Sequence, residues 1–116
     1  MHHFAYRNGV LHCEDVSLEA VARELGTPAY VYSDATLRRH YQALAEAFAN
    51  RDLLIAFAVK ANSNQAVLAT LARLGAGMDV VSEGELRRAR AAGVGLRACL
   101  PAARPARLTQ RAAAWG

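Results

Sequence analysis

The order of apolar runs and helical patterns between residues 29 and 93 limits the fold of this chain more than any other feature. The run LLIAFAV at 53–59 holds seven apolar residues without alternation, which is typical of a strand buried on both faces. Short β-rich runs lie at 29–32 and 77–81, and a helical pattern follows each of the three runs. This order, with short connections, predicts an α/β fold of parallel strands and crossover helices.

Capping residues mark the predicted helices, and a turn signal marks a hairpin before them. Asn8-Gly9 between two apolar runs predicts a β-hairpin at 4–12. A short helix from Ser17 to Gly26 follows. The later helices begin at residues that can cap them, namely Ser33 or Asp34, Ser63 or Asn64, and Ser82, and the last two end at Gly75 and Gly93.

Lys60 follows the apolar run directly and is the only lysine among 14 basic residues. The C-terminal end of a parallel strand faces the active site in α/β barrels and the ligand crevice in open sheets. An amine there can be partly desolvated, which frees its nucleophilic lone pair, whereas arginine stays charged and forms no Schiff base. A simpler interpretation, in which Lys60 ends a strand and reaches water, stays open from position alone.

The residues around Lys60 resemble the signature of one enzyme family. FAVKAN at 57–62 is followed by NQAVLATLARLGAGMDVVSEGELRRARAAG at 64–93. This combination is similar to the fold-type III pyridoxal-phosphate decarboxylases. Within that group, YRNGVLHCEDVSLEAVARELGTPAYVYSDATLR at 6–38 looks most like the diaminopimelate decarboxylases. The resemblance covers about residues 4–94.

The resemblance implies an enzyme that uses pyridoxal 5′-phosphate to convert meso-2,6-diaminopimelate to L-lysine and CO2. Lys60 would hold the cofactor aldehyde as a Schiff base, and Asp79 would contact the cofactor region near it. Glu85 matches a cofactor-region glutamate of the family. From the residues alone, Asp79 could instead cap the next helix or close a turn. Glu85 could equally complete a capping box by bonding the backbone N–H of Ser82.

The resemblance also implies the beginning of a TIM (β/α)8 barrel, preceded by an N-terminal β-hairpin that belongs to a β-domain. We expect three parts, namely a hairpin and short helix at 1–28, the first β/α units of a cofactor-binding barrel at 29–95, and an atypical tail at 96–116. A complete barrel takes about 250 residues, so we expect an incomplete fold. The family's phosphate-binding loop has no counterpart here, and its members act as homodimers.

Residues 97–116 have a different composition, with seven alanines, four arginines, two prolines and no acidic residue. A further strand is due here if the β/α order continues, and none is visible. The resemblance ends near Gly95. We therefore hypothesise that this stretch is frameshifted or prematurely ended. Its arginines could favour nucleic acid, but only Trp115 lies among them, which argues against recognition of bases by stacking.

Other features narrow the class of protein. No apolar stretch approaches the roughly 18–20 residues of a membrane-spanning helix, and the N-terminus lacks a secretory pattern. We therefore expect a cytoplasmic protein with no membrane partner. The histidines show no spacing typical of a metal site, and the resemblance implies an amino-acid substrate. Two alternatives remain open. One is a related decarboxylase acting on ornithine, arginine or carboxynorspermidine, and the other is a non-catalytic barrel protein that binds pyridoxal phosphate.

Overall fold

The structure is a computed structural model that describes residues 2–101. It divides into two compact units, residues 1–40 and residues 41–116. In chain order the elements are β1 (Phe4–Arg7), β2 (Val10–Cys13), β3 (Val16–Ser17), α1 (Leu18–Leu25), α2 (Asp34–Ala47), β4 (Ala56–Ala58), the short 3-10 helix η1 (Val59–Ala61), α3 (Gln65–Arg73), β5 (Gly77–Val80), α4 (Glu83–Ala91), a second 3-10 helix η2 (Leu96–Ala98) and β6 (Cys99–Pro101).

The first unit contains the expected hairpin. β1 and β2 pair antiparallel with Arg7 opposite Val10, which leaves Asn8 and Gly9 as a two-residue turn. Both turn residues have positive φ, 52° and 82°, and this is the backbone that the Asn-Gly pair adopts most readily. The predicted hairpin is confirmed. The short strand β3 adds to the other side of β2, and sequence reasoning did not foresee it.

Helix α1 begins and ends as the sequence predicted. The Ser17 hydroxyl oxygen accepts a hydrogen bond from the backbone N–H of Ala20 at 3.4 Å. Gly26 follows the last turn with a φ of 82°, which a residue with a side chain rarely adopts. The cap and the stop are therefore both confirmed.

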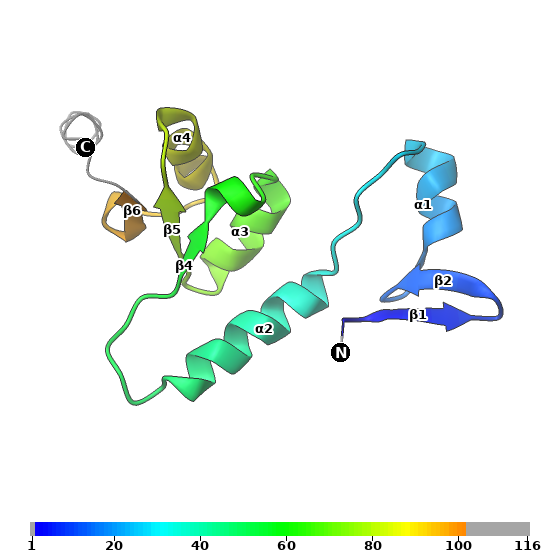
Figure 1. The fold of residues 1–116 in the computed structure, drawn as a ribbon, viewed down its shortest axis with the longest axis horizontal. Coiled ribbons are helices and arrows are strands. Elements are labelled where there is room, and N and C mark those ends of the chain that lie inside the picture. Colours follow the sequence, from blue (N-terminus) through cyan, green and yellow to red (C-terminus); the bar gives the residue numbers. More distant parts are fainter. Residues whose placement is uncertain (1, 102–116) are drawn as a thin grey trace. The chain divides into compact units, whose positions relative to one another are not determined.

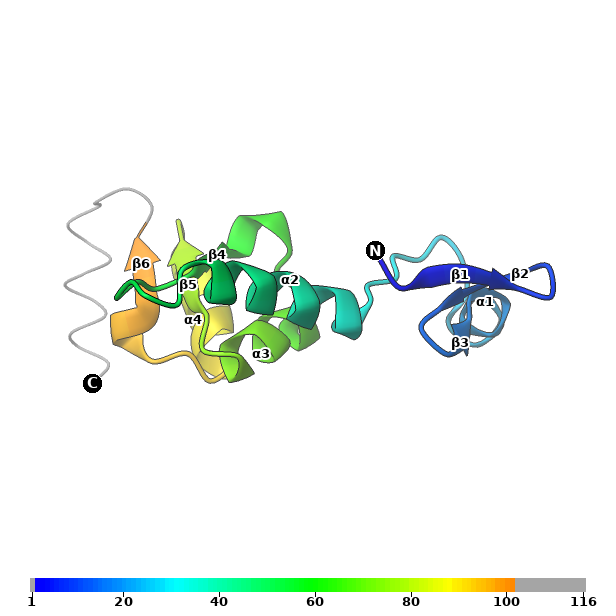
Figure 2. The same ribbon diagram turned by 90° about the horizontal axis from the view of Figure 1, so that it is seen from below.

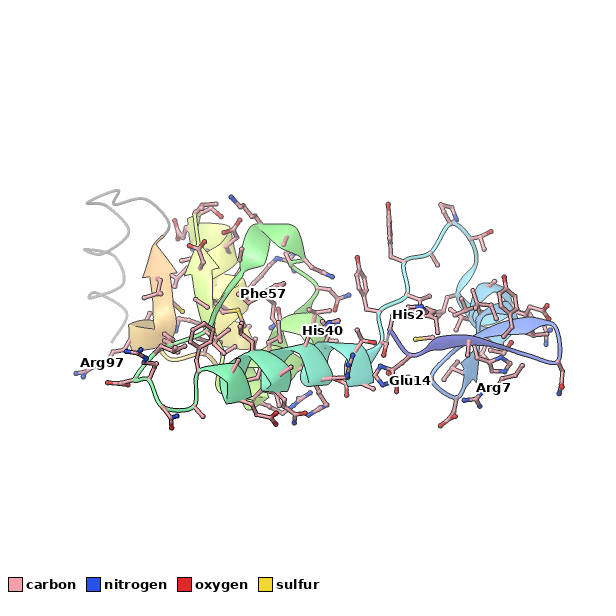
Figure 3. All side chains as sticks on the ribbon, turned by 60° about the horizontal axis from the view of Figure 1, so that its bottom comes forward. His2, Arg7, Glu14, His40, Phe57 and Arg97 are labelled. Carbon is pink, nitrogen blue, oxygen red and sulfur yellow. The ribbon has the colours of Figure 1, made fainter. Side chains whose placement is uncertain are left out.

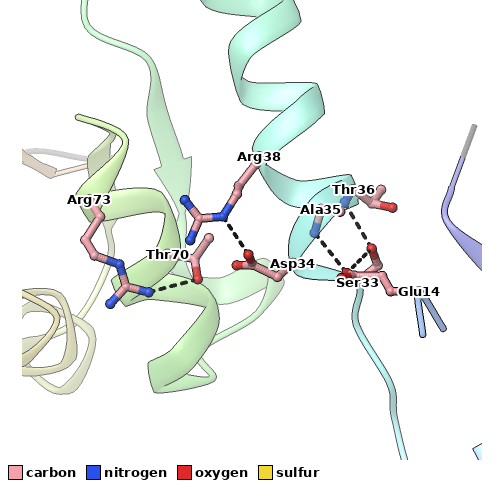
Figure 4. A network of polar contacts seen from close by, with 8 residues as sticks. All are labelled: Glu14, Ser33, Asp34, Ala35, Thr36, Arg38, Thr70 and Arg73. Atoms are coloured by element: carbon pink, nitrogen blue, oxygen red, sulfur yellow. Dashed lines mark hydrogen bonds and ion pairs between the residues drawn. The ribbon is translucent and has the colours of Figure 1, made fainter. Parts of the chain in front are cut away.

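The start of α2 is fastened to the turn that follows β2. One Glu14 carboxylate oxygen accepts hydrogen bonds from the Ser33 hydroxyl at 2.7 Å and from the Ala35 backbone N–H at 2.9 Å (Figure 4). Ser33 in turn caps the helix by accepting from the Thr36 N–H. These donors lower the pKa of the Glu14 carboxyl below its ordinary value, the Ala35 N–H contributing most. Figure 3 labels Glu14 among the side chains of this unit.

The predicted strand at 29–32 is wrong. Residues 29–32 join no sheet in the described part of the chain, although their composition favours a strand. Tyr30 is 92% exposed. A strand needs a hydrogen-bonded neighbour, and β-branched and aromatic composition gives only a preference for one.

The second unit holds a parallel sheet in the order β4-β5-β6 (Figure 1). Helix α3 connects β4 to β5, and α4 connects β5 to β6. The two helices contact each other, and α4 contacts β5 (Figure 2). The prediction of parallel strands joined by crossover helices is therefore confirmed for this unit.

The core of this unit lies between the strands and the two helices. Val59, Leu68 and Met78 are its largest fully buried side chains. Helix α3 contributes Val67 and Leu71 to the same core. Helix α2 differs from α3, because none of its residues is buried.

Two strands of this unit differ from the sequence expectation. The strand expected at 53–59 is only the three residues of β4, and the chain turns into η1 at Val59. A strand, β6, also exists at Cys99–Pro101, where none was expected. It pairs in parallel with β5, Cys99 lying opposite Met78. A three-residue strand leaves little apolar pattern to recognise, and the neighbouring strand decides its conformation.

Gly77 allows this sheet to pack closely at the start of β5. A Cβ placed on Gly77 would lie 2.7 Å from the Ala98 carbonyl oxygen and 2.8 Å from a methyl carbon of Leu54. Glycine within a strand often marks such a close approach of another backbone. Because Gly77 has no side chain, the backbone at Ala98, just before β6, can pack against the start of β5.

Three further points concern the chain as a whole. None of the helices in the described residues combines the length and apolar character needed to cross a membrane. The frameshift hypothesis for 97–116 rests mainly on residues that lie outside the described part of the chain. The division into parts at 28 and 95 stays a prediction.

Candidate active site

Lys60 lies in the 3-10 turn that directly follows β4. Val59 before it is completely buried, whereas Lys60 itself is exposed. The turn contacts both β5 and α4. Burial of Val59 therefore fixes the backbone of the turn in the core, while the amine of the next residue reaches the surface at the carboxyl end of the strand.

Asp79 lies beside this turn on the neighbouring strand. In the parallel register Ala58 is the partner of Asp79, so Lys60 follows only two positions after the residue opposite the carboxylate. Met78 and Val80 on either side of Asp79 are buried, and Asp79 is half-buried. Side chains alternate along a strand, so Asp79 stands on the opposite face from those two core residues. The structure thus brings Lys60 and Asp79 to one edge of the sheet.

Glu85 lies in the first turn of α4 and takes part in a cap. Its carboxylate accepts a hydrogen bond from the Val81 backbone N–H at 2.7 Å, and its own N–H donates to the Ser82 hydroxyl at 3.2 Å. The capping interpretation expected the carboxylate on the N–H of Ser82, which is wrong by one residue. Ser82 is extended, with φ −143° and ψ 161°, and the bond reaches the residue before it. Glu85 therefore holds the backbone just after β5 by a hydrogen bond.

The loop between Lys60 and α3 is held by polar side chains. Asn62 accepts a hydrogen bond from the Asn64 N–H at 3.0 Å, and Asn64 caps α3 by accepting from the Ala66 N–H at 2.9 Å. Arg88 donates to the Ser63 carbonyl oxygen at 3.2 Å. Of the two caps that the sequence allowed, Asn64 is thus the observed one.

Arg88 and Gln65 were missed by sequence reasoning. The Gln65 amide nitrogen donates to the Arg88 carbonyl oxygen at 3.1 Å, so two hydrogen bonds join α4 to the loop and to the first residue of α3. The bonded positions are 23 and 25 residues apart. No local pattern signals such a pair, because it depends on how two helices pack.

A cavity of about 140 Å³ lies elsewhere in the second unit. Its lining includes the residues that lead into β4, namely Leu53, Leu54 and Ile55, together with Gly75 and part of α2. These residues precede the parallel strands, so the cavity lies at the opposite strand ends from Lys60. It takes no part in the site.

The side chains at this edge fit part of a pyridoxal cofactor. Its aldehyde needs a reachable primary amine, and Lys60 supplies the chain's single lysine amine in an exposed position. Asp79 supplies a carboxylate at the same edge, able to interact with a protonated nitrogen. A glycine-rich phosphate loop is not among the described residues.

Comparison with known proteins agrees with this chemistry. Residues 34–104 match the family described as pyridoxal-dependent decarboxylase, pyridoxal binding domain. The match extends beyond Gly95, so the expectation that the resemblance ends there is wrong.

Two relatives carry the same protein name. A diaminopimelate decarboxylase of Haemophilus influenzae is 52% identical over 93 residues, which is 80% of this chain and 22% of the relative. That of Pseudomonas aeruginosa is 54% identical over 90 residues, 78% of this chain and 22% of the relative. The chain therefore spans 22% of the length of these relatives.

Solved structures agree with the sequence comparison. A crystal structure of diaminopimelate decarboxylase from M. jannaschii superimposes with a TM-score of 0.74 at 34% identity, covering 79% of this chain and 23% of that one. A second structure of that protein, in co-complex with L-lysine, gives a TM-score of 0.73 at 34% identity, with 78% and 22% coverage. Because the family match takes in more than half of its residues, this chain belongs to the pyridoxal-dependent decarboxylases, within their pyridoxal binding domain.

Proposed function

We propose that the complete protein carrying this chain is a pyridoxal-phosphate-dependent decarboxylase that converts meso-2,6-diaminopimelate to L-lysine and CO2. One observation carries the proposal, namely that the only lysine of the chain stands exposed at the carboxyl edge of a parallel sheet beside Asp79. Relatives named diaminopimelate decarboxylase, at identities from 45% to 54%, support the choice of substrate.

Lys60 is the proposed covalent anchor of the cofactor. Its Nζ would hold the cofactor through the aldehyde carbon, with the aldehyde oxygen lost as water. By holding the cofactor there, Lys60 would fix the position at which the substrate amine meets it. When bound, pyridoxal phosphate supplies an electron sink for the electron pair that remains on the substrate carbon after CO2 departs. A proton delivered to that carbon completes L-lysine.

Asp79 and Glu85 are proposed to support the same edge. The Asp79 carboxylate favours a protonated, positively charged nitrogen close to the anchored carbon. Glu85 is the third proposed cofactor-region residue by its place in the family motif. Its hydrogen bond to the Val81 N–H supports a second role for Glu85, which is to fix the backbone two residues beyond Asp79.

The test uses a hybrid enzyme, in which the matched residues of this chain replace those of the Pseudomonas aeruginosa relative. Sequence identity of 54% over 90 residues favours correct folding of the hybrid. We expect the hybrid to release CO2 from meso-diaminopimelate and to be inactive on ornithine and arginine. A folded hybrid that binds pyridoxal phosphate but releases no CO2 from diaminopimelate would contradict the proposal, and a preference for ornithine would favour the related decarboxylases.

The finer features of the fold and assembly are part of this proposal. The parallel unit would be the beginning of a (β/α)8 barrel, and the hairpin would belong to a β-domain completed by later residues. We also propose a homodimer in the cytoplasm. Light scattering of the complete protein should give twice the mass of one subunit, and cell fractionation should find the protein in the cytoplasmic fraction.

A further inference from the structure

Two hydrogen bonds running in opposite directions join helix α4 to the loop after Lys60 and to the first residue of α3. Arg88 Nη1 donates to the Ser63 carbonyl oxygen at 3.2 Å, and Gln65 Nε2 donates to the Arg88 carbonyl oxygen at 3.1 Å. One residue of α4 thus gives a bond from its side chain and receives one on its backbone. The pair forms a clamp between segments 23 and 25 positions apart.

The clamp holds the backbone on the C-terminal side of Lys60 in place. On the N-terminal side, the buried Val59 holds the 3-10 turn in the core. On the C-terminal side, Ser63 is only three positions from Lys60, and its carbonyl is held by Arg88. The backbone of Lys60 is therefore tied at both ends, while its side chain remains exposed.

The partners available on α4 explain why Arg88 reaches across to the loop. Arg87 has an acidic residue four positions before it and pairs with that residue, Glu83, at 2.7 Å. Arg88 has Gly84 at the equivalent position, and Glu85, three positions before Arg88, accepts the Val81 N–H instead. Arginine suits the bond across, because its long side chain carries several N–H donors and stays charged.

We infer that Arg88, together with Gln65, is a positioning residue for Lys60. Its guanidinium donates to the Ser63 carbonyl, and through that bond it would set the position of the amine. The inference rests on the proposed function, in which Lys60 is the cofactor anchor. A shifted amine would approach the cofactor aldehyde less favourably even in a chain that remains folded.

The experiment compares Arg88→Met with Arg87→Met. Both variants remove one positive charge from α4, and only the first removes the bond to the loop. In the hybrid enzyme, hydrogen exchange of the amides between residues 60 and 65 should speed up about fivefold in Arg88→Met, because the net contribution of one hydrogen bond, about 1 kcal/mol, corresponds to that factor. Exchange in Arg87→Met should match the parent chain. Gln65→Met removes the other half of the clamp and should act in the same direction.

The second measurement tests the consequence for Lys60 in the hybrid enzyme. We expect Arg88→Met to weaken the affinity for pyridoxal phosphate about fivefold and to move the pH midpoint of the cofactor absorbance band, with an unchanged melting temperature. A change in stability alone would not move that midpoint. Equal exchange, affinity and midpoint in both arginine variants would overturn the inference. A parent hybrid without any Lys60-dependent cofactor band would instead contradict the proposed function, and with it the basis of the inference.

Discussion

Ala58 and Asp79 are direct partners in the parallel pairing of β4 and β5. Because Lys60 follows Ala58 by two positions, this register places the lysine and the carboxylate at the same edge of the sheet. A slip by one residue would turn Asp79 to the other face of the sheet, where Met78 and Val80 are buried. The proposed site therefore depends on strand register as much as on residue type.

Replacing Lys60 by arginine should abolish cofactor attachment in the hybrid enzyme. The positive charge is kept and the nucleophilic amine is lost, so the cofactor absorbance band should disappear and decarboxylation should fall at least about a thousandfold. Absorbance spectra and CO2 release measure the two effects. Adding Arg97→Lys to the same variant returns one amine at an exposed position, and it should rescue neither effect. Survival of both band and activity would show that Lys60 is not the anchor.

Asp79→Ala should lower turnover more than stability. The side chain is half-buried and stands on the face opposite the buried residues of β5, so its removal leaves little cavity. We expect turnover of the hybrid to fall about tenfold or more, with a change of about 0.5 kcal/mol in unfolding free energy. Asp52→Ala, at an exposed aspartate before β4, is the matched control. Parallel losses of activity and melting temperature would instead favour a role in the turn.

Local signals predicted much of the second unit correctly. The helix caps Asn64 and Ser82 and the stops at Gly75 and Gly93 depend on residues a few positions away, and such patterns are visible in a sequence. The predicted alternation of strands and helices is also found in this unit, because crossover connections follow from chain order. The position of Lys60 at the end of a parallel strand is therefore predictable from the sequence alone.

The features that were missed depend on distant partners. Residues 29–32 have strand composition but no strand neighbour in the described residues, whereas Cys99–Pro101 has weak composition and pairs with β5. The Arg88 clamp joins positions 25 apart. In each case the deciding contact lies outside the window in which periodicity or capping can be read.

Gly77→Ala should destabilise the second unit. The added Cβ would lie 2.7 Å from the Ala98 carbonyl oxygen, so backbone must move. We expect a loss of about 1–3 kcal/mol in unfolding free energy, measured by chemical denaturation of the hybrid. Gly95→Ala is the control, because its surroundings are open and its φ of −67° suits alanine. An equal effect of both substitutions would mean that the close approach at Gly77 is not limiting.

The Glu14 contacts should make the first unit less stable in acid. Donors from Ala35 and Ser33 lower the pKa of this carboxyl in the folded chain, so its contribution is present above the unfolded pKa. That contribution is lost as the pH falls through the lower, folded pKa. Glu14→Gln should therefore be less stable than the parent near neutral pH, and the difference should shrink below about pH 4.

Hydrogen exchange of the α2 amides at a series of pH values measures this effect. Glu24→Gln is the control, since Glu24 is an exposed carboxylate on α1. Its stability should follow that of the parent chain at every pH. A constant difference between Glu14→Gln and the parent chain down to pH values well below about 4 would contradict a role for the ionised carboxylate.

The 116-residue chain by itself should lack decarboxylase activity and should associate. In the described residues, β4 and β6 are the edges of the parallel sheet, and exposed strand edges can pair with another copy. Leu54 and Leu100 are 44% and 42% exposed, which adds apolar surface beside these strands. No glycine-rich cradle for the cofactor phosphate is found among residues 2–101 either, so Lys60 would hold the cofactor only weakly. Light scattering should therefore report oligomers or aggregates, and an assay with diaminopimelate and added pyridoxal phosphate should release no CO2. A monomer in solution that turns over the substrate would show that the site is complete within these residues, and would refute the view that later parts of a barrel are needed.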